Sequence, residues 1–213
     1  MQTLLCKKLL GKYCFERYAS ILGIDFETIM NTIDKSKSIG IFGGSFNPIH
    51  EGHALVAERA LEVLDIDLVI MMVSRSNSLK PKYDLSVAER AEFCIQFIGD
   101  KNKKILVSSF EEDIKSTCTH DLLPLIKEFS DVDFTFIMGA DCALNFHLWY
   151  NYQEILSMVK IAIFERPSYI DRLEKECKIL GLENVSVYRG KTIDISSTEI
   201  RNREKNLNSK NFI

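Results

Sequence analysis

Apolar residues follow two patterns along this chain, and the two patterns alternate. Short runs rich in apolar and β-branched residues predict strands at residues 39–42, 67–73, 104–109, 134–138, 159–164 and 185–188. Between them, apolar residues recur every three or four positions, which predicts helices at 54–64, 87–98, 119–129, 153–158 and 170–180. Continuous apolar strands are typical of parallel sheets buried on both faces. The pattern therefore predicts an α/β protein with a doubly wound, Rossmann-like parallel sheet and helices on both of its faces.

A separate segment, residues 1–36, precedes the first predicted strand. Its large apolar residues recur at helical spacing on either side of Gly23, which predicts two short amphipathic helices. We divide the chain into this helical N-terminal extension and a main domain, residues 37–213. The extension either packs on the main domain or serves as an oligomer contact or regulatory element. The sequence leaves both open, and with them the formation of a homo-oligomer.

The first predicted strand leads into a glycine pair, an Asn-Pro turn and two histidines. Gly43 and Gly44 let backbone approach a ligand closely, and the chain then turns at Asn47. His50 and His53 are three residues apart, so they share one face at the start of the next helix. Free N–H groups and the helix dipole favour a phosphate there. Zinc binding is the weaker alternative, because the zincin pattern needs its histidines four residues apart.

A second candidate phosphate site lies near the end of the sequence. Ser196 and Glu199 have the spacing of a capping box, so a helix is predicted to begin there. The hydroxyl groups of Ser197 and Thr198, the open N–H groups of the helix and the Arg201 guanidinium together suit a polyphosphate.

Composition narrows the class of protein. The chain has 213 residues, of which 46% are hydrophobic and 27% charged, as in an ordinary globular protein. Its net charge of −3 gives no reason to expect a nucleic acid partner. No apolar run approaches the roughly 18 residues of a membrane helix, so no membrane association is expected. The six cysteines are widely spaced, without a C-x-x-C pair, which favours reduced thiols and a cytoplasmic location.

Three blocks of the sequence resemble a known family. Residues 43–53, GGSFNPIHEGH, resemble the first signature of the HxGH nucleotidyltransferases, and residues 195–201, ISSTEIR, resemble the second. Residues 138–156, with MGAD, FHLW and EIL, are most similar to the bacterial nicotinate-nucleotide adenylyltransferases. The resemblance covers roughly residues 38–203. It implies an enzyme of NAD biosynthesis that transfers AMP from ATP to nicotinate mononucleotide, giving deamido-NAD and pyrophosphate, with Mg²⁺ carried by ATP.

The resemblance also implies roles for individual residues. The catalytic pair would be His50, on the polyphosphate, and His53, on the α-phosphate. The residues implied in ATP binding are Gly43, Gly44, Ser45, Phe46, Lys80, Gly139, Asp141, Ile195, Ser196, Ser197, Thr198 and Arg201. The residues implied in binding nicotinate mononucleotide are Asn47, Thr119, Trp149 and Arg166. Trp149, the only tryptophan, would stack on the pyridine ring. No protein ligand to a metal is implied.

The chain departs from the family pattern at several positions. Ser78 stands for proline in the loop before Lys80, Leu122 stands for the second threonine of the segment after residue 116, and Ser168 stands for glycine. The alternatives are another HxGH enzyme, acting on nicotinamide mononucleotide, pantetheine phosphate or a cytidylyl acceptor, and a non-catalytic nucleotide-binding regulator. His120 matches no motif and His147 belongs to the FHLW block, and we expect both at the surface.

Overall fold

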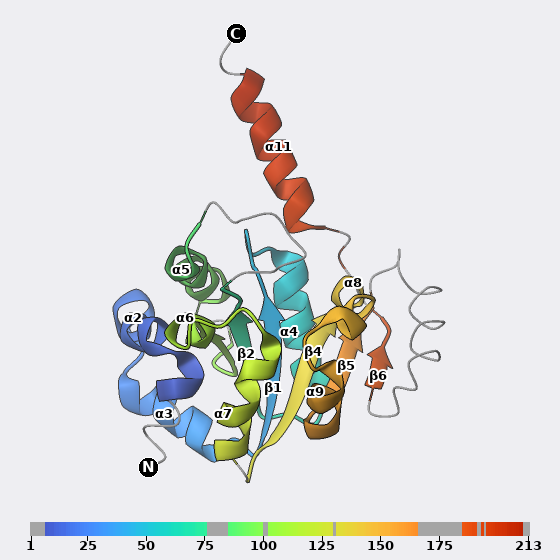
Figure 1. Cartoon of the computed structure of the whole chain (residues 1–213). Coiled ribbons are helices and arrows are strands. Elements are labelled where there is room, and N and C mark those ends of the chain that lie inside the picture. Colours follow the sequence, from blue (N-terminus) through green and yellow to red (C-terminus); the bar gives the residue numbers. More distant parts are fainter. Residues whose placement is uncertain are drawn as a thin grey trace.

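The computed structural model describes residues 7–75, 85–99, 102–129, 131–165, 185–190, 193 and 195–210 (Figure 1). The helix predicted at 170–180 and two predicted site residues, Lys80 and Arg166, lie outside these ranges.

A parallel sheet forms the centre of the described structure. Its strands are β1 (Ser38–Gly44), β2 (Leu68–Val73), β3 (Ile105–Ser108), β4 (Asp133–Gly139), β5 (Lys160–Phe164) and β6 (Val185–Tyr188). They run in the order β3-β2-β1-β4-β5-β6, and every neighbouring pair is parallel. Each predicted strand is present within one or two residues of its expected bounds. The residues of β2 are buried at every position, as a strand covered on both faces requires.

Helices surround the sheet, which confirms the predicted fold class (Figure 1). They are α4 (Glu51–Val63), α5 (Val87–Ile98), α6 (Phe110–Asp113), η1 (Thr119–Leu122), α7 (Leu123–Glu128), α8 (Ala140–Ala143), η2 (Phe146–Leu148), α9 (Tyr152–Met158) and α11 (Ser197–Lys210). In Figure 1, α11 begins at the rim of the domain and projects away from it.

The prediction of one continuous helix at residues 119–129 was wrong. Residues 119–129 form the 3₁₀ turn η1 followed by the separate helix α7, instead of a single helix. Pro124 lies in the first turn of α7. Because proline has no N–H to give to the preceding turn, it begins a helix readily and cannot continue one.

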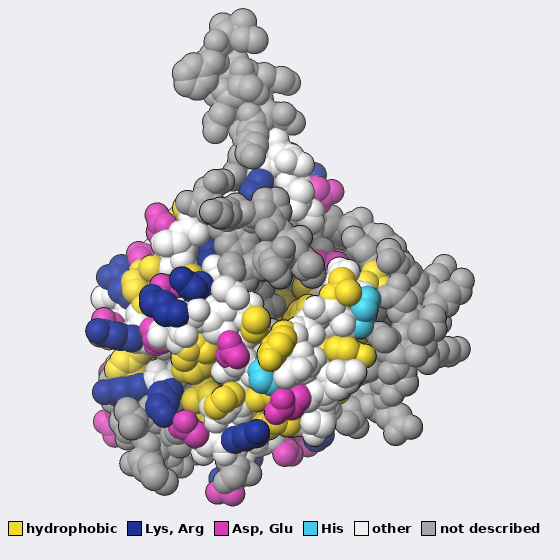
Figure 2. Space-filling model, in the orientation of Figure 1, with side chains coloured by type: hydrophobic (Ala, Val, Ile, Leu, Met, Phe, Trp, Pro, Cys, Tyr) yellow, Lys and Arg dark blue, Asp and Glu magenta, His cyan; other side chains and the backbone are white. Residues whose placement is uncertain are grey.

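The N-terminal extension forms the two predicted helices, α2 (Lys12–Leu22) and α3 (Phe26–Lys35). It packs against α5 and along β3, the edge strand of the sheet. Its residues Leu9, Leu10 and Cys14 are fully buried and belong to the same continuous core as the sheet. Figure 2 shows Lys and Arg side chains gathered over this region. The Arg17 guanidinium of α2 pairs with the Glu92 carboxylate of α5 at 3.0 Å. The extension is therefore tied to the main domain by both apolar and ionic contacts.

The strand order creates one place where a ligand can enter the sheet. From β1 the chain passes to β2 and β3 on one side, and then crosses to β4, β5 and β6 on the other. Connections that leave neighbouring strands in opposite directions open a crevice at the strands' carboxyl ends. Here that crevice lies between β1, which ends at Gly44, and β4, which ends at Gly139.

Candidate active site

The two histidines form a stacked pair at the beginning of α4. His50 is the N-cap residue and is only 4% exposed, and His53 lies in the first turn. Their ring centroids are 3.7 Å apart with the planes inclined by 26°. The backbone N–H of His50 donates to Nδ1 of His53 at 3.3 Å. Since Nδ1 accepts this bond, the neutral His53 ring carries its proton on Nε2, which is then a donor.

Aromatic and glycine residues hold this pair in position. The ring of Phe46, which is almost fully buried, packs edge-on against His53 at 5.0 Å. A Cβ atom at Gly52 would lie 3.1 Å from the His50 ring and 3.3 Å from Cγ2 of Ile195, which is tighter than ordinary contact. Gly52 therefore lets the His50 ring and the second signature pack against α4. Because the Phe46 side chain is buried against His53, a nucleotide can contact this residue only through its backbone.

The first residues of α11 dock on the turn that precedes α4. The Ser197 hydroxyl donates to the Pro48 carbonyl at 2.9 Å, and the Arg201 guanidinium donates to the Asn47 carbonyl and to the Thr198 hydroxyl. The predicted capping box is confirmed, with Ser196 N–H donating to Glu199 Oε2 at 3.0 Å and Glu199 N–H to Ser196 Oγ at 3.2 Å. Two motifs about 150 residues apart in sequence thus meet at one turn.

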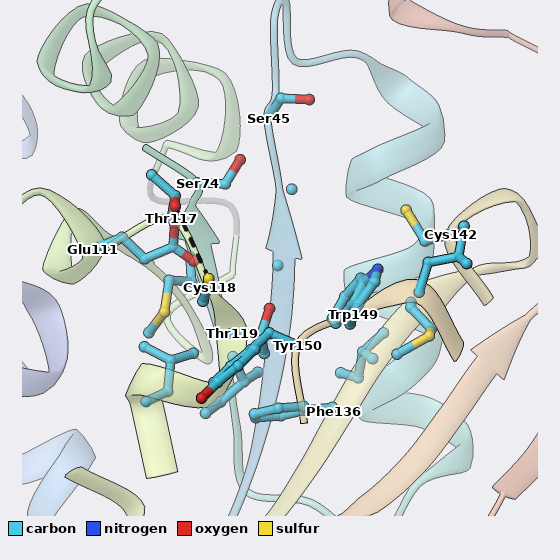
Figure 3. Close-up of a pocket in the computed structure, with 18 residues that line it drawn as sticks. Ser45, Ser74, Glu111, Thr117, Cys118, Thr119, Phe136, Cys142, Trp149 and Tyr150 are labelled. Carbon is cyan, nitrogen blue, oxygen red and sulfur yellow. Dashed lines mark hydrogen bonds between the residues drawn. The ribbon is translucent and has the colours of Figure 1, made fainter. Parts of the chain in front are cut away.

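A cavity of about 260 Å³ opens at the carboxyl ends of β1, β2 and β4 (Figure 3). Gly43, Gly44 and Ser45 line it where β1 ends, and Figure 3 shows Thr119 with Cys118 on one side and Trp149 with Cys142 on the other. The remaining lining residues are Ile41, Met72, Ser74, Glu111, Thr117, Leu122, Phe136, Ile137, Met138, Leu148 and Tyr150. Trp149 is half-buried, and its ring packs edge-on against Phe146 at 5.2 Å. The cavity thus offers a flat aromatic surface opposite a polar wall.

Four other predicted site residues that the structure describes do not line this cavity. Asn47 and Arg201 line a neighbouring cavity of about 610 Å³, together with residues of α5. Gly139 ends β4, and Asp141 stands in the first turn of α8. A Cβ atom at Gly139 would lie 2.7 Å from Asp141 Oδ1, so this carboxylate folds back over the glycine. The predicted set is therefore divided between the cavity, the turn before α4 and the start of α8.

Two charged residues that belong to none of the motifs lie at the site. Glu111 lines the cavity and is buried, and its Oε2 accepts from the Arg75 backbone N–H at 2.9 Å. Burial raises the pKa of Glu111 to about 7, against the opposing effects of that hydrogen bond and the nearby charge of Arg90. Arg90 is 1% exposed and donates to the carbonyls of Ser45 at 2.7 Å and Ser74 at 2.9 Å. It thereby joins the segments that follow β1 and β2.

One surface prediction was wrong. The His120 side chain is only 21% exposed, and its Nε2 lies 2.7 Å from Glu154 Oε2. The partner carboxylate is 34 residues away in sequence, so no local pattern indicates it. His147, in contrast, is exposed as expected.

The described part of the chain contains neither a metal-binding cluster of side chains nor a helix that could span a membrane. No group of three or more His, Cys, Asp or Glu side chains there could hold a metal ion. None of the helices in that part is both long enough and apolar enough to cross a membrane.

Comparison with known proteins identifies the family. Residues 41–203 match the cytidylyltransferase-like family. The chain is 31% identical over 173 residues to a protein of Pelagibacter ubique named as a nicotinate-nucleotide adenylyltransferase, covering 80% of this chain and 96% of the relative. It is 34% identical over 187 residues to one from Agrobacterium fabrum, covering 78% of this chain and 99% of the relative.

A solved structure supports the fold. The Plasmodium falciparum nicotinic acid mononucleotide adenylyltransferase complexed with NaAD superimposes with a TM-score of 0.65 at 23% identity, covering 78% of this chain and 83% of that one. The family resemblance predicted from the two signatures is thus confirmed by the sequence comparisons, and the solved structure confirms the fold. The chain belongs to the cytidylyltransferase-like family and, within it, to the nicotinate-nucleotide adenylyltransferases, which are nucleotidyltransferase enzymes.

Proposed function

We propose that this protein transfers AMP from ATP to nicotinate mononucleotide, giving deamido-NAD and pyrophosphate. The observation that carries the proposal is the meeting of α11 with the turn before α4, next to the cavity with Trp149 on one wall. The turn supplies hydrogen-bond donors for a triphosphate, and the cavity supplies a surface for a flat ring. The names of the curated relatives agree with this acceptor.

On the phosphate side, His53 is the central residue. Its Nε2–H would donate to the α-phosphate, where charge develops as the bond to the leaving pyrophosphate breaks. The buried His50, Ser197, Thr198 and Arg201 would hold the β- and γ-phosphates, since hydroxyl and guanidinium groups at a helix N-terminus bind such anions. The attacking phosphate oxygen of the acceptor is already ionised at neutral pH. No general base is needed, and in-line positioning supplies much of the rate.

The remaining assignments follow the same division of the site. We assign the backbone at Gly43, Gly44, Ser45 and Phe46, and the residues Lys80, Gly139, Asp141, Ile195 and Ser196, to ATP, and Asn47, Thr119, Trp149 and Arg166 to the acceptor. Trp149 would stack on the pyridine ring, and the wall carrying Thr119 would face the ring's carboxylate.

Members of this family use a divalent metal ion together with ATP, and we propose that here the ion is Mg²⁺. The described groups at the turn are imidazole, hydroxyl, guanidinium and backbone N–H groups, which suit phosphate oxygens better than a hard cation. The ion would therefore be held by the phosphates, where it neutralises their charge. We also propose a cytoplasmic location, since the four described cysteines are free thiols.

The test is pyrophosphate release from ATP with a panel of acceptors: nicotinate mononucleotide, nicotinamide mononucleotide, pantetheine phosphate and none. Release that depends on nicotinate mononucleotide supports the proposal. ATP binding without release for any acceptor would instead indicate a nucleotide-binding regulator. Release with a different acceptor alone would keep nucleotidyl transfer and overturn the substrate assignment.

A further inference from the structure

We infer that His120 is a positioning residue of the acceptor pocket, which fastens the segment that carries Trp149 to the helix that carries Thr119. This inference rests on the proposed function, in which these two residues form the walls around the pyridine ring. It concerns a residue that matches no motif of the sequence.

The two walls belong to different elements, and His120 connects them. Thr119 and His120 are the first two residues of η1, whereas Trp149 stands in the segment between η2 and α9. From η1, His120 Nε2 reaches Glu154 Oε2 in the first turn of α9 at 2.7 Å. The same nitrogen lies 3.4 Å from the side-chain nitrogen of Asn151, and the Tyr150 ring packs edge-on against the imidazole at 5.2 Å. One side chain therefore contacts three of the five residues that follow Trp149.

Charged groups of both signs surround this contact. On η1, Asp121 Oδ1 lies 3.7 Å from His120 Nδ1, and on α7, Lys127 Nζ lies 3.9 Å from the other oxygen of Glu154. The hydrogen bond from His120 is the largest of the effects that lower the pKa of Glu154, so the carboxylate is ionised at neutral pH. A carboxylate that accepts from an imidazole makes a stronger and more directional bond than a neutral acceptor.

The segment that carries Trp149 is partly exposed and turns sharply. Tyr150 is 63% exposed, and Leu148 on the other side of Trp149 is also exposed. Asn151 has a left-handed backbone with φ of 48°, which marks a tight turn into α9. The Trp149 ring itself contacts Phe146 of η2. The backbone N–H of Tyr152 donates to the Trp149 carbonyl at 3.3 Å, and the Tyr152 ring also packs edge-on against Phe146. These contacts lie within the segment or join it to η2, whereas His120 joins it to η1, so without His120 we expect Trp149 to sample more orientations relative to Thr119.

The kinetic test uses His120→Ala, His120→Gln and the matched control His147→Ala. We expect His120→Ala to raise KM for nicotinate mononucleotide about fivefold, as for a partly exposed ion pair, with kcat and KM for ATP within twofold of wild type. His120→Gln should recover most of the loss, because its amide N–H can still donate to Glu154. His147 is an exposed histidine close to Trp149 in sequence that does not line the cavity, so its removal should leave all three constants unchanged.

The second test does not need turnover. Because Trp149 is the only tryptophan, acrylamide quenching of the intrinsic fluorescence reports on this residue alone. We expect stronger quenching in His120→Ala than in wild type or His147→Ala, in the absence of substrates. Unchanged quenching together with an unchanged acceptor KM would overturn the inference. An equal loss in both KM values and kcat with a lower melting temperature would also overturn it, by assigning His120 a general structural role. If wild type shows no acceptor-dependent turnover, the proposed function fails, and quenching alone decides the role of His120.

Discussion

Replacing His53 by alanine is expected to lower kcat by about 10²–10³ while the fold stays intact. The orientation of the ring is fixed before substrate binds, because its Nδ1 accepts from the His50 backbone N–H and its faces pack on His50 and Phe46. The remaining nitrogen, Nε2, is therefore a preorganised donor. Loss of one such donor to a transition-state oxygen costs about 2.7–4 kcal/mol, which corresponds to this loss of rate.

Two further variants separate the donor from the packing. His53→Asn keeps an acceptor near the position of Nδ1 but has nothing at the position of Nε2, so it should be about as slow as alanine. His53→Gln can place its amide nitrogen near the position of Nε2 and should recover part of the rate. The assay is pyrophosphate release at saturating ATP and acceptor, with thermal melting to verify folding and His147→Ala as control. A folded His53→Asn enzyme with near-normal kcat would refute the catalytic assignment and leave the turn as a binding element only.

Three other predictions concern the cavity and the extension. Burial raises the pKa of Glu111 to about 7, above its ordinary 4.5, so ionisation of this carboxyl disfavours the folded state. At about 1.4 kcal/mol per pH unit, wild type should therefore lose about 3 kcal/mol of its free energy of unfolding between pH 4.5 and 8. Urea unfolding should show that Glu111→Gln removes this loss and that Glu112→Gln does not; parallel pH profiles for wild type and Glu111→Gln would contradict the assignment. The ratio of kcat/KM for nicotinate over nicotinamide mononucleotide should be about 10²–10³, since the carboxylate gains charged hydrogen bonds and the amide recovers part of them; equal values would reject the specificity while leaving adenylyl transfer standing. Deleting residues 1–36 should lower the melting temperature and increase binding of a hydrophobic dye, because Leu9, Leu10 and Cys14 are fully buried; a truncated protein that melts and turns over like the full chain would show that the extension is dispensable.

The strands could be predicted because a parallel sheet is buried on both faces, so its strands are continuous apolar runs in the sequence. The residues of β2 are all apolar and all buried, and those of its neighbours in the sheet, β1 and β3, are mostly buried. The helix at residues 119–129 was predicted less well, since periodicity continues across Pro124 although the backbone hydrogen bonds do not. The spacing of apolar residues thus predicts which segments are helices, whereas proline and the backbone hydrogen bonds determine where one helix ends and the next begins.

The turn before α4 could be predicted because its glycines and histidines are restricted by local geometry. Glu111, Arg90 and His120 could not, for three different reasons. Glu111 is one of two adjacent glutamates, and only burial distinguishes it from Glu112. Arg90 binds backbone carbonyls, which every residue has. His120 depends on a carboxylate that only the fold brings near it.

The contact between the extension and β3 has a consequence for assembly. Alternate residues of an edge strand point their N–H groups away from the sheet, and in β3 and the residue that follows it these three groups are already bonded. The N–H of Ile105 donates to the Asn102 carbonyl, that of Val107 to the Tyr18 hydroxyl, and that of Ser109 to the Leu10 carbonyl. An edge with its donors occupied offers no template for a strand of a second molecule. Self-association of this protein by continuation of the sheet past β3 is therefore blocked, and a homo-oligomer would have to form through another surface.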